Sequence, residues 1–402
     1  MSSTGLSKPR LARLREVLSG HVERKEMPGL VALVSHHDEV HIETIGEMTV
    51  GQPAPMSRDT IFRIASLSKP VTAAAAMILV EECKLRLDDS IEPWLPELAN
   101  RRVLKSLSSP PDDPNETVPA HRAITVRDLL TFRMGFGSLI APPNTYPIQR
   151  LVREYKIGGD GAPRPARGPS TEEWLKRLSS LPWMTQPGER WMYHVASDVL
   201  SVLIARVSGQ SLGEFMRQHL FEPLGMRDTG FYVPDEKLDR LPACYNRGAG
   251  KLNVFDDVAN SSWRGPPPFE SGGGGLVSTV SDYFAFCRML LNKGRHDGEQ
   301  ILSRAAVELM TTDHLTPEQR TGAEVFFGGY RSWGFGMSVD IRRDELYHVP
   351  GRFGWDGGLG TSAYTDPENE MIGILFTQRM MESPEQPRVF TDFWTLAYGA
   401  LV

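Results

Sequence analysis

The sequence predicts an α/β fold in which both ends of the chain build one sheet and a helical region is inserted in the middle. Three observations support this prediction. Two runs near the start, at 29–35 and 40–45, have the apolar or alternating character of paired strands. Two runs near the end, at 360–365 and 371–377, have the same character. Helical patterns occupy much of the chain between these pairs.

The opening elements are a helix followed by a hairpin. The helix is predicted over 9–26 from five apolar residues at helical spacing, namely Leu11, Leu14, Val17, Leu18 and Val22. Residues 29–35 then read as a buried strand. The polar stretch 36–39 turns the chain into 40–45, where apolar and polar residues alternate.

The middle of the chain contains a buried helix and two long loops. Residues 71–82 are apolar nearly all round, which predicts a helix buried on every side. The loops, at 106–123 and 141–169, are rich in Pro and longer than a compact domain normally needs. We expect them to form a lid or a substrate-facing insertion.

The remaining elements are three helices, the final strand pair and a closing helix. The helices are predicted over 171–181, 197–207 and 280–291, the last opened by Thr279 in a capping-box pattern with Asp282. Residues 366–369 form the turn between the two final strands, and 390–402 is an apolar run that predicts the closing helix.

Composition narrows the class of protein. The 402 residues favour two or three domains, and 40% hydrophobic with 23% charged residues is ordinary globular composition. The net charge of −6 does not indicate a basic surface of the kind that binds nucleic acid. The longest apolar stretch, 71–80, is too short to span a membrane, and the first residues lack the apolar core of a signal peptide. We therefore expect a soluble, cytoplasmic protein.

Metal and disulfide sites are not expected. The three cysteines, Cys83, Cys244 and Cys287, lie far apart and form no ligand cluster. The ten histidines include no H-E-x-x-H pattern, so we expect no zinc. Gly272 to Gly275 are expected to form a turn-rich loop, because no phosphate-binding motif accompanies them.

Ser66 and Lys69 form the one S-x-x-K motif of the sequence, at the start of the buried helix. Two residues three apart at a helix start share a face, so the amine can reach the hydroxyl. A buried lysine has a lowered pKa and can act as a base toward that hydroxyl. A chain of this length holds about one such motif by chance at ordinary composition. Pro70 is compatible with a helix here only if the helix begins at about Ser66.

Ser211 lies in a second serine motif, Gly209-Gln-Ser-Leu-Gly213, which has the G-x-S-x-G pattern of α/β-hydrolases. That pattern requires a strand before the serine and a helix after it. The preceding residues are helical, so we interpret Gly209 as a helix C-cap and Ser211 as the N-cap of the next helix.

Seven segments in chain order resemble the serine β-lactamase and penicillin-binding-protein superfamily, above all its class C-like esterase branch (family VIII carboxylesterases). The first contains Ser66 and Lys69, and the third ends at Tyr193. The segments, which lie within a similarity running from about residue 29 to 378, are 64–73, 124–130, 187–193, 221–226, 272–279, 333–336 and 353–361.

The resemblance implies roles for individual residues. Ser66 would be the acylated nucleophile and Lys69 its base partner, with Tyr193 as the second catalytic group, acting as phenolate or as relay. The backbone N–H groups of Ser66 and Gly358 would bind the oxyanion, since a glycine at a strand edge lets the substrate approach closely. His194, beside Tyr193, is either a tuning group or only a neighbour.

Two departures from the lactamase pattern concern substrate binding. Val195 stands where the lactamases have an asparagine that binds an acylamide. Trp355, Asp356 and Gly357 stand where they have Lys-Thr-Gly, so the lysine that attracts a substrate carboxylate is absent, whereas the esterase branch commonly has Trp-x-Gly. We assign these four residues to substrate binding.

The resemblance implies a β-lactamase-like fold, with an antiparallel sheet flanked by helices and an inserted helical domain. We expect residues 1–80 and 190–402 to form the α/β domain and residues 81–189 the inserted lid, with the site in the cleft between them.

The implied function is hydrolysis of small carboxylic esters by a serine carboxylesterase, through an acyl-enzyme on Ser66 and without a cofactor. Three alternatives stay open, namely an acyltransferase, a β-lactamase or D-amino-acid peptidase, and a non-enzymatic binding module. For the second, the loop at 141–169 offers cationic candidates for binding a carboxylate: Arg150, Arg153, Arg164 and Arg167. The oligomeric state and the natural ester are left open.

Overall fold

The computed structural model describes residues 5–158, 161–248 and 250–402, and it contains a central sheet between layers of helices. Residues 159–160 of the second predicted loop lie outside the described residues. The strands are β1 (Gly29–His36), β2 (Glu39–Gly46), β3 (Phe62–Arg63), β4 (Arg102–Leu104), β5 (Thr117–Pro119), β6 (Cys244–Gly248), β7 (Lys251–Asp256), β8 (Val277–Ser278), β9 (Arg295–His296), β10 (Glu299–Gln300), β11 (Arg331–Trp333), β12 (Ser338–Asp340), β13 (Phe353–Gly357), β14 (Thr361–Asp366) and β15 (Met371–Thr377).

The helices lie before, between and after these strands. They are α1 (Lys8–Glu23), α2 (Ser68–Glu81), α3 (Val126–Leu130), α4 (Ile148–Glu154), α5 (Thr171–Ser179), α6 (Val195–Ser208), α7 (Leu212–Met216), α8 (Val280–Leu291), α9 (Arg304–Met310), α10 (Glu324–Phe327) and α11 (Arg388–Gly399). A short 3₁₀ turn, η1 (Ala65–Leu67), directly precedes α2.

The main sheet has seven strands in the order β11-β12-β13-β14-β15-β1-β2. Every neighbouring pair in it is antiparallel, and β1 from the start of the chain pairs with β15 from its end. The expected fold class is therefore confirmed. Strands β11 to β13 were not predicted, because three to five residues are too few for a clear alternating pattern.

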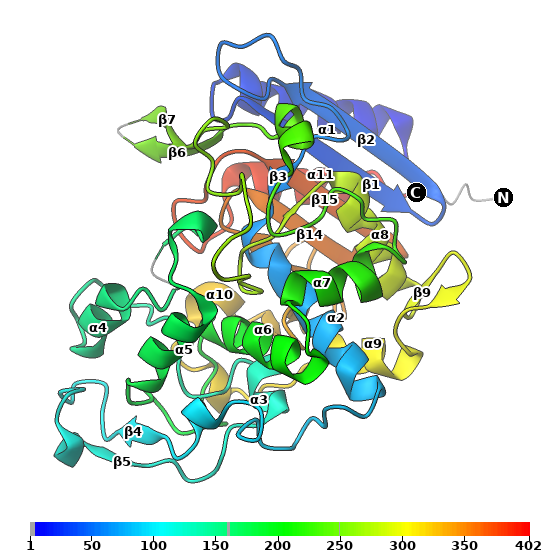
Figure 1. Cartoon of the computed structure of the whole chain (residues 1–402). Helices are drawn as coiled ribbons and strands as arrows, with labels where there is room; N and C mark the ends of the chain where they lie inside the picture. The colour runs from blue at the N-terminus through cyan, green and yellow to red at the C-terminus, as the bar shows by residue number, and fades with distance from the viewer. Residues whose placement is uncertain (1–4, 159–160, 249) are drawn as a thin grey trace.

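Alternating residues of the sheet face two different cores. On β1, Leu30, Ala32 and Val34 pack with α1 and α11 on one face, and Val31 and Leu33 point to the other face. This period of two is the property of a strand covered on both sides. Figure 1 shows α1 and α11 beside each other over the sheet, and a bridge between Leu6 and Leu401 joins the two ends of the described chain.

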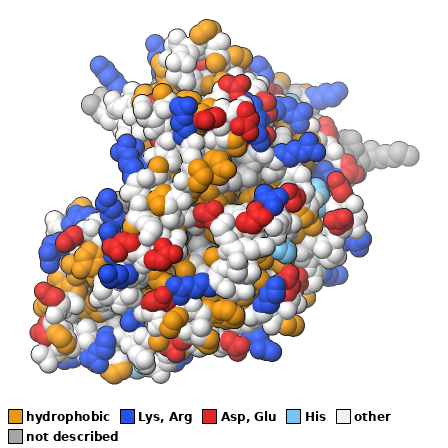
Figure 2. Space-filling view, viewed as in Figure 1, with side chains coloured by type: hydrophobic (Ala, Val, Ile, Leu, Met, Phe, Trp, Pro, Cys, Tyr) orange, Lys and Arg blue, Asp and Glu red, His pale blue; other side chains and the backbone are white. Residues whose placement is uncertain are grey.

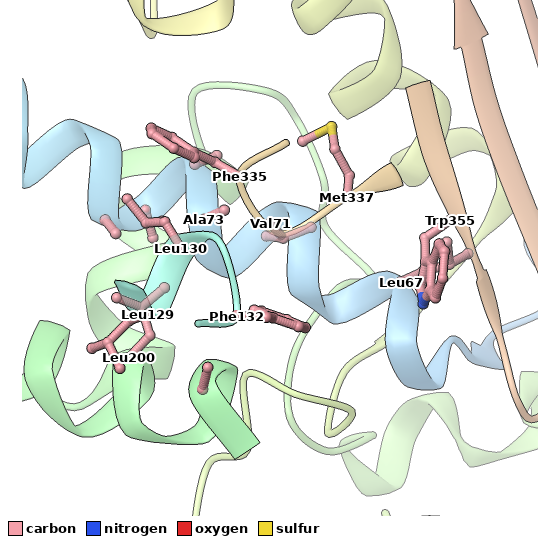
Figure 3. Close-up of a cluster of buried hydrophobic side chains, with 14 of the residues drawn as sticks. Leu67, Val71, Ala73, Leu129, Leu130, Phe132, Leu200, Phe335, Met337 and Trp355 are labelled. Carbon is pink, nitrogen blue, oxygen red and sulfur yellow. The ribbon is translucent and has the colours of Figure 1, made fainter. Parts of the chain in front are cut away.

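Helix α2 runs through the larger core and positions the site at its N-terminal end. Twelve of its fourteen residues are buried, as its apolar sequence predicts. Pro70 lies in the first turn of α2, where backbone N–H groups have no partner within the helix, so the proline costs no helix hydrogen bond. Figure 3 shows α2 packed between α3, α6 and the segment that carries Phe335 and Met337, with Trp355 beside Leu67.

The remaining predicted helices are present with small changes in their ends. Helix α6 begins two residues earlier than predicted, α8 spans the predicted residues, and α11 ends before the last apolar residues. We propose residues 81–189 as an inserted domain; this segment carries α3, α4 and α5, and α3 packs against α6.

The described surface carries both signs of charge. Figure 2 shows acidic and basic side chains interspersed over the visible face, without a continuous basic area. Among the described helices, none is long and apolar enough to cross a membrane.

Candidate active site

Ser66 is held in a tight turn between β3 and α2. Strand β3 pairs with β8, and the buried Arg63 at its end forms an ion pair with Asp256. The next turn places Ala65 at φ 45°, a conformation that costs a non-glycine residue energy and that the surrounding structure must hold. The carbonyl of Ile64 is fixed by a 3.1 Å hydrogen bond from Thr361. This turn presents the Ser66 hydroxyl at the end of α2.

Lys69 reaches Ser66 as the S-x-x-K spacing predicts. Its Nζ lies 3.0 Å from Ser66 Oγ and 3.3 Å from His194 Nδ1, and it also donates to the carbonyl of Gly273. The side chain is fully buried. Burial lowers the pKa of Lys69 to about 7, although the charge of Asp198 raises it. A large fraction of Lys69 is therefore neutral at neutral pH and able to accept a proton.

Tyr193 is the second side chain in contact with the Ser66 hydroxyl. Its hydroxyl donates to Ser66 Oγ at 2.7 Å and accepts from Trp355 Nε1 at 2.8 Å. Burial raises the pKa of Tyr193 to about 12, although the hydrogen bonds with Ser66 and Trp355 lower it. The Lys69 Nζ also lies 4.6 Å from the centre of the tyrosine ring. At neutral pH the phenol is therefore protonated and can pass a proton between oxygens.

His194 and Asp198 form a pair beside Lys69. From the sequence, His194 stays open as either a tuning group or only a neighbour, and Asp198 is not identified. His194 Nε2 lies 3.2 Å from Asp198 Oδ2, and its Nδ1 faces Lys69. His194 is at φ 80° and ψ −65°, an unfavourable conformation for a non-glycine residue, immediately before α6. In the sequence, this pair could have been recognised only from the spacing of four residues between a histidine and an aspartate at a helix start, and that spacing alone is a weak indication of contact.

The glycine loop at 272–275 completes the surroundings of Asp198. Asp198 Oδ1 accepts from Ser271 Oγ at 2.6 Å and from the Gly273 N–H at 3.1 Å. A Cβ added at Gly273 would lie 2.7 Å from Asp198 Oδ1 and 3.1 Å from the His194 ring. Glycine is required here because the loop passes against these two side chains.

The Ser66 hydroxyl faces a cavity of about 300 Å³. Trp355, Phe326 and Ile140 give it an apolar wall, and Gly358 lies at its edge. Within the described residues, no acceptor contacts the backbone N–H groups of Ser66 and Gly358. Two N–H groups without an acceptor among the described residues, on residues that line the same cavity as a serine hydroxyl, have the composition of an oxyanion hole.

The other three predicted binding residues lie in different surroundings. Asp356 lines the cavity, and its carboxylate accepts from Ser362, Tyr364 and Gln386. Gly357 is absent from the cavity wall, and a Cβ there would lie 2.3 Å from the carbonyl of Ile64. Val195 is fully buried in the core.

The cationic side chains near the cavity differ from the predicted ones. Arg331 of β11 lines it and is 4% exposed, with its Nε donating to Asp340 at 3.1 Å. Arg153, Arg164 and Arg167 instead line a neighbouring cavity of about 380 Å³, which adjoins His194 and Asp198. No local pattern singles out Arg331, because β11 is brought to the cavity by the sheet alone. Among the described residues, no three His, Cys, Asp or Glu side chains are arranged to hold a metal ion.

Comparison with known proteins shows which family the chain resembles. A family model described as Beta-lactamase matches residues 14–391. The chain is 37% identical to Protein Rv1367c of Mycobacterium tuberculosis over 380 residues, covering 91% of this chain and 88% of that protein. It is 30% identical to Lovastatin esterase of Penicillium rubens, covering 85% of this chain and 86% of the esterase.

A solved structure has the same overall fold. It is EstCE1, described as a hydrolase with promiscuous acyltransferase activity, with a TM-score of 0.80 and 25% sequence identity. The match covers 97% of this chain and 99% of EstCE1. The likeness therefore includes the sheet, the helical region and the segments that supply the cavity.

Proposed function

Because the chain belongs to the Beta-lactamase family, we propose that it is a serine hydrolase that cleaves small carboxylic esters through an acyl-enzyme on Ser66. The main supporting observation is that Ser66 Oγ contacts both Lys69 Nζ and Tyr193 OH at the edge of the cavity. A serine hydroxyl is a weak nucleophile until an adjacent base takes its proton. The esterases among the relatives support the same reaction class.

Acylation begins when the neutral amine of Lys69 takes the Ser66 proton and Oγ attacks the ester carbonyl carbon. The carbonyl electrons move to the oxygen, which the N–H groups of Ser66 and Gly358 stabilise. The bond from carbon to the alcohol oxygen then breaks. The leaving oxygen takes a proton from Tyr193. The protonated Lys69 amine, which lies 4.6 Å from the centre of the tyrosine ring, then returns a proton to the phenolate directly, because the acylated Ser66 Oγ can no longer carry one.

Deacylation repeats these steps with water. The water oxygen attacks the acyl carbon while its proton moves to the Lys69 amine. The bond to Ser66 Oγ breaks, and Oγ recovers the proton as the carboxylic acid leaves. Tyr193 acts as a neutral relay throughout, because its raised pKa disfavours a resting phenolate.

The cavity wall favours esters over β-lactams. A β-lactam brings an acylamide and a carboxylate into the cavity, and Val195 is buried where the lactamase asparagine would bind the amide. An unpaired polar group costs about 1–3 kcal/mol on burial, and about 1.4 kcal/mol corresponds to a factor of ten. Trp355 stands where the lactamase lysine would pair the carboxylate, and Arg331, which lines the cavity, is paired with Asp340. The two losses together give a penalty of roughly a hundredfold.

The test compares kcat/KM for p-nitrophenyl butyrate and nitrocefin on one preparation, with Ser66→Ala as the blank. We expect the ester to be preferred by about a hundredfold or more and both activities to vanish in the variant. Comparable values for the two substrates would place the protein with the β-lactamases. Ester turnover that survives in Ser66→Ala would contradict the proposed nucleophile.

Acyl transfer is a second candidate, because it uses the same acyl-enzyme and differs only in the acceptor. The structural likeness to EstCE1, a hydrolase with promiscuous acyltransferase activity, supports it. Adding a small alcohol during ester turnover separates the two reactions. A new ester among the products indicates transfer, and free acid alone indicates hydrolysis.

A further inference from the structure

The three neighbours of Lys69 Nζ match the hydrogen-bonding groups of a neutral amine. A neutral amine has two N–H donors and one lone pair. The Gly273 carbonyl can only accept, so it takes one N–H. His194 Nδ1 can take the second N–H only if that nitrogen carries a lone pair. The amine lone pair is then left for the Ser66 hydroxyl at 3.0 Å.

Asp198 supplies the group that selects this histidine tautomer. Its Oδ1 already accepts from Ser271 and from the Gly273 N–H, and its Oδ2 lies 3.2 Å from His194 Nε2. A carboxylate can only accept, so Nε2 must carry the proton and Nδ1 the lone pair. The opposite tautomer would direct an N–H at the lysine nitrogen and compete with Ser66 for its lone pair.

We propose that His194 and Asp198 are a positioning pair, which fixes the His194 tautomer and thereby aims the lone pair of Lys69 at the Ser66 hydroxyl. This inference rests on the proposed function of Ser66. Neither residue exchanges a proton with the substrate. The strained backbone of His194 and the glycine at 273 are the local features that bring the pair within contact of the lysine.

The same pair sets the charge around Lys69. Asp198 opposes the effect of burial on the pKa of Lys69. His194 and Ser271 contact this carboxylate. Burial raises the pKa of Asp198, while His194, Ser271 and the charge of Lys69 hold it below its usual value. Two other ionisable groups are nearby: Tyr193, whose ring faces Lys69, and Asp356, whose charge acts on Tyr193. Four cations line the second cavity together with His194 and Asp198, namely Arg153, Lys156, Arg164 and Arg167.

Asp198→Asn is the decisive variant, because the structure dictates how the amide must lie. Ser271 and the Gly273 N–H both donate to Oδ1, so the amide oxygen occupies that position and the NH₂ group faces His194 Nε2. The donor then forces the lone pair onto Nε2 and the proton onto Nδ1. The substitution changes few atoms but reverses the tautomer.

The first readout is the tautomer itself, which needs no enzymatic activity. Long-range ¹H–¹⁵N correlation on histidine-labelled protein distinguishes the two forms, and His194→Phe assigns the signal. We expect a proton on Nε2 in the wild type and on Nδ1 in Asp198→Asn. A proton on Nδ1 in the wild type would overturn the proposal, whether or not the protein hydrolyses esters.

The second readout is ester kinetics against pH. We expect Asp198→Asn to lower kcat by about 10²-fold or more with little change in KM, because general-base catalysis is lost and not substrate contact. The acid limb of kcat/KM should move to lower pH, because the negative charge that raises the pKa of Lys69 is gone. A wild-type kcat, or an acid limb at the wild-type position, would overturn the proposal.

Two further variants separate positioning from loss of fold. Asp282→Asn changes another buried carboxylate, which accepts from Thr229 at 2.9 Å and lines neither cavity, so its pH profile should match the wild type. His194→Phe keeps Asp198 and its contacts with Ser271 and Gly273 but removes the acceptor, so it should lose kcat to a similar extent. His194→Phe with wild-type kcat would contradict the proposal even if Asp198→Asn fails to fold. Wild-type protein that turns over no ester would contradict the proposed function instead.

Discussion

Ser66 and Ser211 both lie in motifs typical of nucleophilic serines, yet the structure gives them different surroundings. Ser66 follows a strained residue at the start of α2, and its hydroxyl contacts Lys69 and Tyr193. Ser211 lies between two helices, after Gly209 at φ 72°, and its hydroxyl accepts from the Glu214 N–H at 3.2 Å. It is an N-cap, as its helical context predicts.

The difference lies in the partners and not in the motif. A proton acceptor with a pKa near neutrality lies within hydrogen-bond distance of Ser66. The Ser211 hydroxyl points toward Glu270 Oε1, but the distance of 3.5 Å is longer than an ordinary O–H···O hydrogen bond. The partner of Ser66, Tyr193, comes from a distant part of the chain. The Ser211 hydroxyl instead accepts a hydrogen bond from the backbone N–H of Glu214, three residues away. Only the first arrangement can activate a hydroxyl.

The largest expected difference between the two serines is in turnover. Ser66→Ala should lower kcat for p-nitrophenyl butyrate by about 10⁴-fold or more, since it removes the proposed nucleophile. Ser211→Ala should leave kcat within about twofold, because its hydroxyl only caps a helix. Circular dichroism of both variants checks the fold. Lost activity in a folded Ser211→Ala would reverse the comparison.

The next effect is the loss of the groups that activate Ser66. Lys69→Ala and Tyr193→Phe should each lower kcat by about 10²–10⁴-fold with little change in KM, as expected for acid–base catalysis. Steady-state kinetics on the two variants measures this. A Tyr193→Phe enzyme at the wild-type rate would show that this tyrosine contributes only packing.

The pH dependence gives a smaller but more specific effect. If neutral Lys69 is the base, kcat/KM should be flat above about pH 7 and fall tenfold per pH unit below it, because protonation removes the lone pair. Tyr193 should cause no loss until far alkaline pH, since its pKa is about 12. A profile that instead rises continuously up to pH 10 would indicate a phenolate base.

The smallest expected effect is on the stability of the cap. Ser211→Ala should lower the free energy of unfolding by about 1 kcal/mol, because the Glu214 N–H loses its acceptor. Ser170→Ala is the matched control, since Ser170 caps α5 through the Glu173 N–H at 3.3 Å. Urea unfolding of both variants should give similar changes. An unchanged midpoint for Ser211→Ala alone would argue against the cap.

Local and long-range information contributed differently to these assignments. Ser66 and Lys69 were predictable because their contact follows from helical spacing within one turn. Ser211 was predictable as a cap because the helices on both sides are visible in the sequence. Tyr193 was assigned only through family resemblance, because no spacing rule links it to a residue 127 positions away.

The parts that the sequence did not predict depend on tertiary structure. Strand β11 is too short for a visible pattern, so Arg331 could not be placed at the cavity. His194 and Asp198 acquire their role only when the loop at 272–275 passes between α2 and α6. Val195 looked like a binding residue by its place in the motif, yet α6 begins there and turns its side chain into the core.

The most direct test of the account is the identity of the serine that becomes acylated. The wild-type chain is incubated with a fluorophosphonate probe, digested, and analysed by mass spectrometry, with Ser66→Ala and Ser211→Ala treated in parallel. We predict modification on Ser66 alone, retained in Ser211→Ala and absent from Ser66→Ala. Modification on Ser211, or labelling that persists in Ser66→Ala, would contradict the account.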